Sequence, residues 1–270
     1  CSFGLSAGAN QSWIEVSGLS ENMGKAMEIV EGLIGGAKPD EAILENCKAD
    51  MLKSRADAKL NQSRCFGALQ RYLFYGGDFI RRTTLTDPAL QGLTSEQLLA
   101  KIGDLMGKQH EVLYYGPQKE AEVKSALAEH HKVAADLQPL EKKFSALLPT
   151  DANKVVLAQY DAKQLYYLQF SNRGEKFDVA ADPEITLYNE YFGGGMNTIV
   201  FQEMREARGL AYTAWATLAT PSNANGDYSY YAFIATQNDK MQKAVEAFDD
   251  IINNMPESEK AFGIAKEALV

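Results

Sequence analysis

The clearest pattern along the chain is an apolar helical stripe that occurs twice, at a single long offset that carries Met23 onto Met241. In each copy, six apolar residues follow the spacing i, i+3, i+4, i+7, i+10 and i+11, which places them on one face of an α-helix. The first set is Met23, Ala26, Met27, Val30, Leu33 and Ile34, and the second is Met241, Ala244, Val245, Phe248, Ile251 and Ile252. The pattern predicts two amphipathic helices in equivalent positions.

The surroundings of the two stripes also correspond. A short β-prone run precedes each helix, Trp13–Gly18 before the first and Tyr231–Thr236 before the second. The charged residues Lys25, Glu28, Glu41 and Lys48 recur at the same offset as Lys243, Glu246, Glu259 and Lys266. Amphipathic helices resemble one another, so the stripe alone would be weak evidence. Strand, helix and charges together favour a repeated module whose length equals this offset.

A module of this length divides the chain into parts of two modules. We expect the rear part of one module at residues 1–135, a linker at 136–153, and the front part of the next module at 154–270, with both modules cut short. The expected linker carries Pro139 and Pro149 among charges of both signs, which is typical of a segment between domains.

The remaining periodicities predict further helices and strands. Helices are expected at 40–60, 65–74, from Thr94 to near Gly107, at 183–191 and from 197 onwards. Thr94 and Gln97 have the spacing of a capping box. Strands are expected at 111–115, 154–160 and 164–170, and a hairpin turn at 225–227. Because strands and helices cluster instead of alternating, the fold class is α+β, with helices packed on an antiparallel-rich sheet.

Composition and charge exclude several functional classes. The chain is 46% hydrophobic and 23% charged, as in ordinary globular domains, and no apolar run approaches the ~20 residues of a membrane span. A net charge of −9 without a dense basic stripe makes nucleic acid an improbable partner. Cys1, Cys47 and Cys65 are odd in number and not closely paired, so neither a disulfide framework nor a thiolate zinc site is expected.

The histidines do not form a metal-binding motif. His110 is followed at the third and fourth positions by Leu113 and Tyr114, so neither H-x-x-E-H nor H-E-x-x-H is present. His130 and His131 are adjacent, which places them on different faces of a helix. No G-x-S-x-G elbow accompanies a histidine either. We therefore expect no metal ligands in this chain.

Residues Phe192–Ala214 read FGGGMNTIVFQEMREARGLAYTA. This segment resembles the pitrilysin/insulinase-type (inverzincin) zinc metallopeptidases, whose modules share a glycine-rich turn, a helix and an R-E-x-x-G-L-A-Y ending. The resemblance extends over nearly the whole chain, since these peptidases are built from tandem modules of similar length to the repeat. It implies tandem modules of the LuxS/processing-peptidase-like fold, with the rear of a third module followed by the front of a fourth.

The resemblance implies that an early module of the parent protein holds the catalytic zinc. It also implies that a late module contributes an arginine and a tyrosine seven positions apart. Arg205 and Tyr212 have this spacing and are our candidate catalytic residues. Tyr212 would approach the scissile carbonyl, where negative charge develops, and Arg205 the neighbouring peptide backbone. Two structural explanations stay open, because Arg205 would favour the dipole at a helix C-terminus and Tyr212 could be an ordinary strand residue.

The glycine triplet is the candidate substrate-binding segment. Gly193, Gly194 and Gly195 precede an expected helix but lack the Lys-Ser/Thr of a phosphate loop, so a tight turn with close backbone packing is favoured. The resemblance implies that such a segment can also contact substrate.

We therefore interpret this chain as the C-terminal, substrate-clamping part of a zinc metalloendopeptidase. On this hypothesis the chain itself binds no cofactor, and the zinc lies elsewhere in the parent protein. Its expected partners are a peptide or protein substrate and the N-terminal catalytic half or a partner subunit. Two alternatives stay open: an inactive homologue that serves as a processing-peptidase partner or scaffold subunit, and an unrelated α+β binding module. The compartment, whether cytoplasmic, periplasmic or secreted, is left undetermined.

Overall fold

A computed structural model describes residues 1–8, 11–140 and 146–270. The chain forms two compact units, each with its own packing. The first comprises Cys1–Ala58 and Asp78–Ser145, and the second comprises Lys59–Gly77 and Ala146–Val270. The long helix α3 (Gln62–Thr83) contributes to both units, and its backbone is non-helical at Gly76, where φ is 76°.

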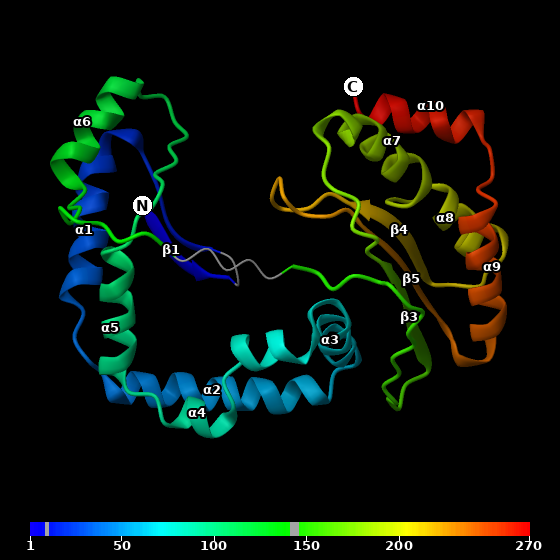
Figure 1. Cartoon of the computed structure of the whole chain (residues 1–270), viewed down its shortest axis with the longest axis horizontal. Helices are drawn as coiled ribbons and strands as arrows, with labels where there is room; N and C mark the ends of the chain where they lie inside the picture. The colour runs from blue at the N-terminus through cyan, green and yellow to red at the C-terminus, as the bar shows by residue number, and fades with distance from the viewer. Residues whose placement is uncertain (9–10, 141–145) are drawn as a thin grey trace. The chain divides into compact units, whose positions relative to one another are not determined.

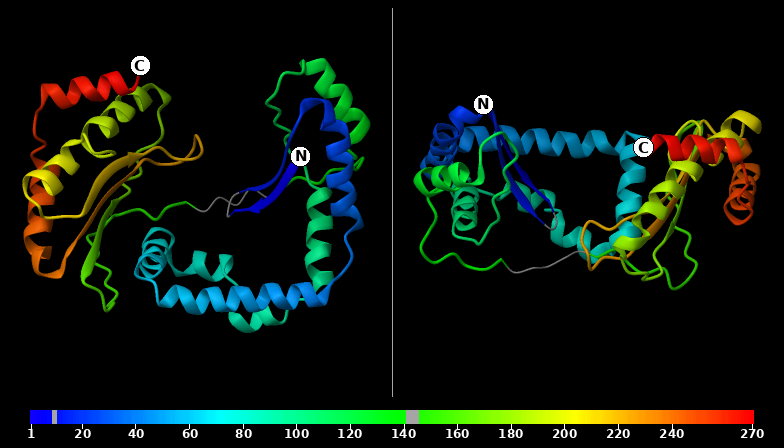
Figure 2. Two further views of the ribbon diagram at one scale, coloured as in Figure 1. Left: turned by 180° about the vertical axis from the view of Figure 1, so that it is seen from behind. Right: turned by 90° about the horizontal axis from the view of Figure 1, so that it is seen from above.

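The first unit is mainly helical. Its elements are β1 (Ser2–Ala7), β2 (Ser12–Ser17), the 3-10 turn η1 (Ser20–Asn22), α1 (Met23–Gly36), α2 (Glu41–Lys59), α4 (Asp87–Gln91), α5 (Ser95–Met106) and α6 (Glu120–His130). Strands β1 and β2 form an antiparallel hairpin, and α1 lies beside α6 (Figure 2). The predicted capping box is present, because Thr94 Oγ1 accepts from Gln97 N while the Gln97 side chain accepts from Thr94 N.

The second unit packs helices against a three-stranded sheet. Its elements, besides the first part of α3, are β3 (Gln164–Ser171), η2 (Val179–Ala181), α7 (Asp182–Phe192), α8 (Ile199–Phe201), the π-helical turn η3 (Gln202–Ala207), β4 (Thr213–Ala219), β5 (Ser229–Gln237), η4 (Asn238–Lys240), α9 (Met241–Asn253) and α10 (Glu259–Ala268). The strand order is β3-β5-β4, with both pairs antiparallel (Figure 1). This arrangement confirms the predicted α+β class.

One face of this sheet carries the core. Because side chains alternate along a strand, Ala214 and Ala216 of β4 lie on the same face as Ala232 and Ile234 of β5. Helices α7, α8, α9 and turn η3 cover this face. They contribute the fully buried side chains Phe192, Val200, Met204, Phe248 and Ile251. Burying each of these large side chains stabilises the unit by ~1.5–3 kcal/mol.

The opposite face meets the first part of α3. The ring centroid of Phe66 lies 5.4 Å from that of Tyr166 and 5.8 Å from that of Phe233, and Phe74 lies 4.6 Å from Phe170. Segment Lys59–Gly77 therefore belongs by packing to the second unit. The predicted division into modules at 136–153 stays a prediction, because compact units and repeated modules are different divisions of the chain.

The internal repeat is visible in the structure. Elements η1, α1 and α2 begin at Ser20, Met23 and Glu41, and elements η4, α9 and α10 begin at the equivalent residues of the second copy, Asn238, Met241 and Glu259. Each helix also follows the second strand of an antiparallel hairpin, but the hairpins differ in length: Ser17 pairs with Ser2, whereas its equivalent, Ala235, pairs with Thr213 instead of with the equivalent of Ser2, Thr220. The buried positions correspond as well, because Ala26 and Val30 are the buried residues of α1 and their equivalents in α9, Ala244 and Phe248, are fully buried.

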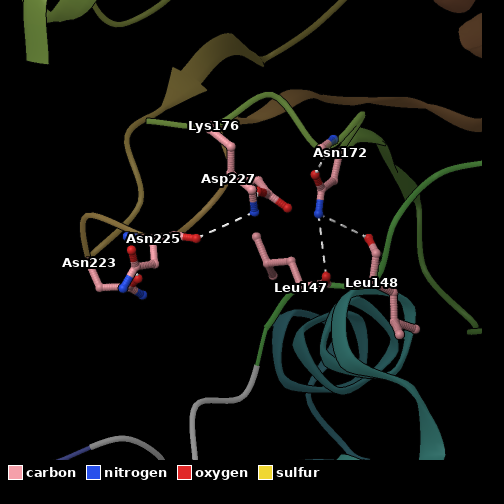
Figure 3. Close-up of polar contacts among 8 residues, drawn as sticks. Leu147, Leu148, Asn172, Lys176, Asn223, Asn225 and Asp227 are labelled. Carbon is pink, nitrogen blue, oxygen red and sulfur yellow. Dashed lines mark hydrogen bonds and ion pairs between the residues drawn. The ribbon is translucent and has the colours of Figure 1, made fainter. Parts of the chain in front are cut away.

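A buried asparagine anchors the start of the second unit to the end of β3. Asn172 is 2% exposed, and its Nδ2 donates to the carbonyl oxygens of Leu147 (3.4 Å) and Leu148 (3.3 Å), as Figure 3 shows. Its Oδ1 accepts from Gly174 N at 3.1 Å, and its backbone exchanges two hydrogen bonds with the Thr150 hydroxyl. The rear of the expected linker is thus fixed in place. Residues 141–145 of that linker lie outside the described residues.

The predicted hairpin turn at 225–227 lies in the β4–β5 connection. Lys176 closes this connection, because its Nζ contacts Asp227 Oδ1 at 2.5 Å and the Asn225 carbonyl oxygen at 3.5 Å (Figure 3). Asn223 Oδ1 accepts from Asn225 N at 3.0 Å inside the turn.

Two predicted strands are wrong. Residues 111–115 and 154–160 are not assigned to any strand, and only the second half of the expected pair, β3, forms. Tyr115 is 104% exposed and both Val155 and Leu157 are 83% exposed, so these β-prone runs lie in solvent without a pairing neighbour. The helix expected at 65–74 corresponds to the first part of α3, which ends at the non-helical Gly76, and a second helical part continues to Thr83.

Candidate functional site

The structure brings Arg205 and Tyr212 together. The guanidinium carbon of Arg205 lies 5.3 Å from the centroid of the Tyr212 ring and 5.0 Å from that of Phe201, which is cation–π geometry. Arg205 lies in η3, a π-helical turn, and such turns are frequent at functional sites. Both side chains are accessible, with Tyr212 68% exposed and the Arg205 side chain 43% exposed.

The backbone that leads to Tyr212 is held tightly although its side chain is exposed. Gly209 ends the helical turn with φ 56°, a conformation that glycine adopts without a steric penalty. Leu210 N and Ala211 N both donate to the Met204 carbonyl oxygen, at 2.9 and 3.3 Å. Tyr212 N then donates to the Ala235 carbonyl oxygen at 2.9 Å, at the start of β4. The backbone that carries the Tyr212 phenol is therefore held in place by hydrogen bonds.

Tyr212 lines a groove between the sheet and the first part of α3. This aromatic groove, as we call it below, has a volume of about 390 Å³. Its lining residues are Ser63, Phe66, Gln70, Gln164, Tyr166, Tyr212, Thr213, Trp215, Phe233 and Ala235. None of these side chains is charged at neutral pH. Trp215 and Phe233 stack in its floor, with ring centroids 5.6 Å apart and an interplanar angle of 26°.

The glycine triplet packs on the edge of β4. A Cβ at residue 193 would lie 1.9 Å from the Ala216 carbonyl oxygen, and Ala216 N donates to the Gly193 carbonyl oxygen at 3.1 Å. The Asn189 side chain pairs with the backbone of Leu218 on the same edge. Gly193 is buried, whereas Gly194 and Gly195 are exposed. Among the described residues, the triplet contacts this edge and its own turn. These contacts do not include Arg205 or Tyr212, so the structure does not join the two candidate sites directly.

Metal ligands do not gather among the described residues, in which no group of three or more His, Cys, Asp or Glu side chains could hold an ion. The histidines instead bond to α1 and to one another. His130 Nδ1 lies 2.8 Å from Glu28 Oε1, His131 Nδ1 bonds to Glu31, and His131 Nε2 lies 2.8 Å from His110 Nε2. In the same ranges, no helix has the length and apolarity that crossing a bilayer requires.

Sequence reasoning missed the aromatic residues of the groove. Phe66, Tyr166, Trp215 and Phe233 come from four elements, the first of which is far from the others in the chain. The one available signal was the alternation of Tyr231 and Phe233 with Ala232 and Ile234, which shows an aromatic face opposite the core face.

Comparisons with known proteins agree with this architecture. The sequence profile of the peptidase M16 inactive domain matches residues 92–269. No curated protein sequence matches the chain.

Solved structures are similar along nearly the whole chain. A peptidase M16 inactive domain from Pseudomonas fluorescens has a TM-score of 0.73 at 17% identity, over 99% of this chain and 66% of that one. A variant of the ferredoxin protease FusC, in complex with Arabidopsis ferredoxin, has a TM-score of 0.74 at 10% identity, over 99% of this chain and 29% of that one. A conserved protein from Enterococcus faecalis has a TM-score of 0.61 at 16% identity, over 99% and 67%.

This chain therefore spans less than two thirds of the first two structures that it resembles. At these identities the structural likeness shows the fold, and the profile match over residues 92–269 shows the family. The chain belongs to the peptidase M16 family, through that family's inactive domain.

Proposed function

We propose that this chain is the substrate-clamping part of a zinc metalloendopeptidase and contributes transition-state contacts to a zinc site on a separate, N-terminal half. The observation that carries the proposal is the Arg205–Tyr212 pair, an exposed phenol under a guanidinium at the mouth of the aromatic groove. The Tyr212 side chain is 68% exposed beside the Arg205 guanidinium and is therefore open to a ligand.

The chemistry assigned to Tyr212 is hydrogen-bond donation. Attack on a peptide carbonyl places negative charge on its oxygen, and a phenol O–H that donates to this oxygen stabilises the transition state more than the ground state. Zinc on the other half would activate the attacking water. The guanidinium of Arg205 lies over the ring, with its carbon 5.3 Å from the ring centroid, and is proposed to orient the ring and to donate N–H groups to a neighbouring peptide carbonyl.

The substrate is proposed to be a peptide or protein held between the two halves. The similar ferredoxin protease, which was solved with ferredoxin bound, supports a protein substrate. Gly193, Gly194 and Gly195 are proposed as a secondary substrate contact. Gly194 and Gly195 would contribute it through their exposed backbone, since Gly193 is buried against β4.

The test uses the full-length protein that contains this chain. Tyr212→Phe keeps the ring and its stacking but removes the donor, so we expect kcat to fall about 100-fold while KM changes less than about threefold. Tyr115→Phe, at a fully exposed tyrosine of the first unit, is the matched control and should leave both constants unchanged. Zinc content is measured in parallel. Unchanged turnover in Tyr212→Phe would remove the catalytic role.

A second candidate is an inactive homologue that acts as a processing-peptidase partner or scaffold subunit. The match to an inactive domain is compatible with this function as well. The two proposals separate in the full-length protein: zinc together with peptide cleavage supports the peptidase, and the lack of both supports the scaffold.

A further inference from the structure

We propose that the aromatic groove binds one large, uncharged apolar side chain of an extended peptide, next to the residue whose carbonyl oxygen meets Tyr212. Its relation to catalysis rests on the proposed function, because Tyr212 is part of its lining. Side-chain binding itself needs only the second unit, since every lining residue belongs to that unit.

The floor of the groove is apolar and incompletely covered. Phe66, Tyr166, Trp215 and Phe233 are each half-buried, so their ring atoms still meet solvent on the groove side. An apolar side chain that covers these rings would gain ~1.5–3 kcal/mol. The volume of about 390 Å³ lies at the lower end of ligand sites, which suits one large side chain with its adjoining backbone.

The rim of the groove is polar but neutral. The Ser63 hydroxyl lies 3.4 Å from the Tyr166 hydroxyl, which holds the polar end of that ring at the rim. The Gln62 side chain donates to the Gln164 carbonyl oxygen at 2.6 Å and fixes the start of β3. Gln70 and Gln164 place amide groups beside the opening, where they suit peptide N–H and C=O groups without attracting a charge.

Charge excludes basic and acidic side chains. A lysine or arginine would find no carboxylate in the lining and would lie near the Arg205 guanidinium. A carboxylate would lose its hydration with no cation in the lining to compensate.

The edge of β4 next to the groove is not available for an added strand along its whole length. Gly193 and Asn189 already bond to Ala216 and Leu218 on that edge, so a peptide cannot pair along the whole strand. A side chain of the peptide can still enter the groove beside Thr213.

Binding is measured with this chain by tryptophan fluorescence. The chain has two tryptophans, Trp13 and Trp215, so a Trp13→Phe background reports Trp215 alone. The probes are capped alanine peptides with Phe, Leu, Ala, Lys or Glu at one central position. We expect saturable changes in emission for Phe and Leu, with affinities at least about tenfold above those for Ala, Lys and Glu, as loss of an apolar contact predicts. Equal affinities for all five peptides, or tighter binding of the Lys peptide, would overturn the proposal.

A nearly isosteric charge change tests the groove without disturbing the floor. Gln70→Glu places a carboxylate at the rim, so we expect the Phe peptide to bind at least about fivefold more weakly and the Lys peptide more tightly. Gln11→Glu makes the same change on the exposed hairpin of the first unit and should change neither affinity. An unchanged preference in Gln70→Glu would place the bound side chain elsewhere and refute the assignment.

The full-length protein separates this inference from the proposed function. If both hold, kcat/KM for the Phe and Ala substrates differs by about the same tenfold ratio as the affinities, and Gln70→Glu reduces that ratio. Selective binding of the Phe peptide without any cleavage would keep the groove and reject the peptidase. Cleavage that ignores the central side chain would reject the groove and keep the peptidase.

Discussion

Gly193 lies so close to Ala216 that a side chain at residue 193 has no room. A Cβ built there would be 1.9 Å from the Ala216 carbonyl oxygen, and the two residues are also joined by a backbone hydrogen bond of 3.1 Å. Ala216 is itself fixed in β4, opposite Ala232 of β5. Neither partner can move away without loss of a sheet contact, so the first glycine of the triplet is a packing requirement.

Replacement of this glycine should therefore be severe. We expect Gly193→Ala to lower the free energy of unfolding by about 3 kcal/mol or more, because the clash involves backbone and cannot be relieved by a change of rotamer. Urea denaturation followed by circular dichroism measures the change.

Gly195→Ala is the matched control, since nothing lies within 4 Å of a Cβ at that position. Its free energy of unfolding should stay within about 0.5 kcal/mol of the unsubstituted protein. Similar losses in both variants would show that the triplet acts as a turn sequence and that the contact with Ala216 is not decisive.

A second prediction concerns Asn172. Asn172→Ala leaves the carbonyl oxygens of Leu147 and Leu148 without their donor and the Gly174 N–H without its acceptor. We expect a loss of about 2 to 4 kcal/mol in unfolding free energy, because buried polar groups without partners are costly. Asn153→Ala, at an exposed position, should cost less than about 0.5 kcal/mol in the same urea titration. Equal effects would mean that segment 146–150 is not held by Asn172.

A third prediction is a pH dependence from Glu41. Hydrogen bonds from the Ser95 hydroxyl and the Ser95 N–H lower the pKa of Glu41 below its usual value, with a smaller contribution from the charge of Lys48 against that of Asp40. A carboxyl with a lowered pKa in the folded state stabilises the fold above its unfolded pKa of ~4.3, and this stabilisation is lost as the pH falls through the folded pKa. Acid should therefore weaken the contact between the start of α2 and the start of α5.

The check is the melting temperature of Glu41→Gln between about pH 3 and pH 7. The variant should melt below the unsubstituted protein at pH 7, and the difference should shrink toward pH 3. Glu267→Gln, on the exposed last turn of α10, is the control. A difference that stays constant with pH would mean that the Glu41 charge does not contribute.

Much of the fold could be predicted because its signals are local. The stripes that begin at Met23 and Met241 set two helices within a residue or two of their observed ends, and the Thr94–Gln97 capping box set the start of a third. The repeat added long-range information, since the two copies match in element order as well as in sequence.

The predictions that failed share one physical cause. A local sequence pattern does not show which distant segment a run of residues will pair with or pack against. Segments 111–115 and 154–160 have strand-like composition, but a strand needs a neighbour and these runs have none. The aromatic groove escaped prediction for the same reason, because α3 packs on strands that come much later in the chain. The spacing of Arg205 and Tyr212 was visible, whereas their stacking depends on the π-helical turn η3.

The last prediction separates the charge of Arg205 from its shape. Arg205→Lys in the full-length protein keeps the cation but loses the plane that stacks on Tyr212 and the fork of N–H donors. If Arg205 orients the phenol and holds the peptide backbone, KM should rise about fivefold to tenfold with a smaller change in kcat, which corresponds to ~1 kcal/mol of binding. Arg208→Lys is the matched control on the neighbouring turn, where Arg208 contacts Glu203 at 3.4 Å and Asp250 at 3.9 Å, and a lysine can replace such contacts. Equal kinetics in both variants would mean that Arg205 acts only as a charge at the end of its helix and that Tyr212 needs no stacked partner.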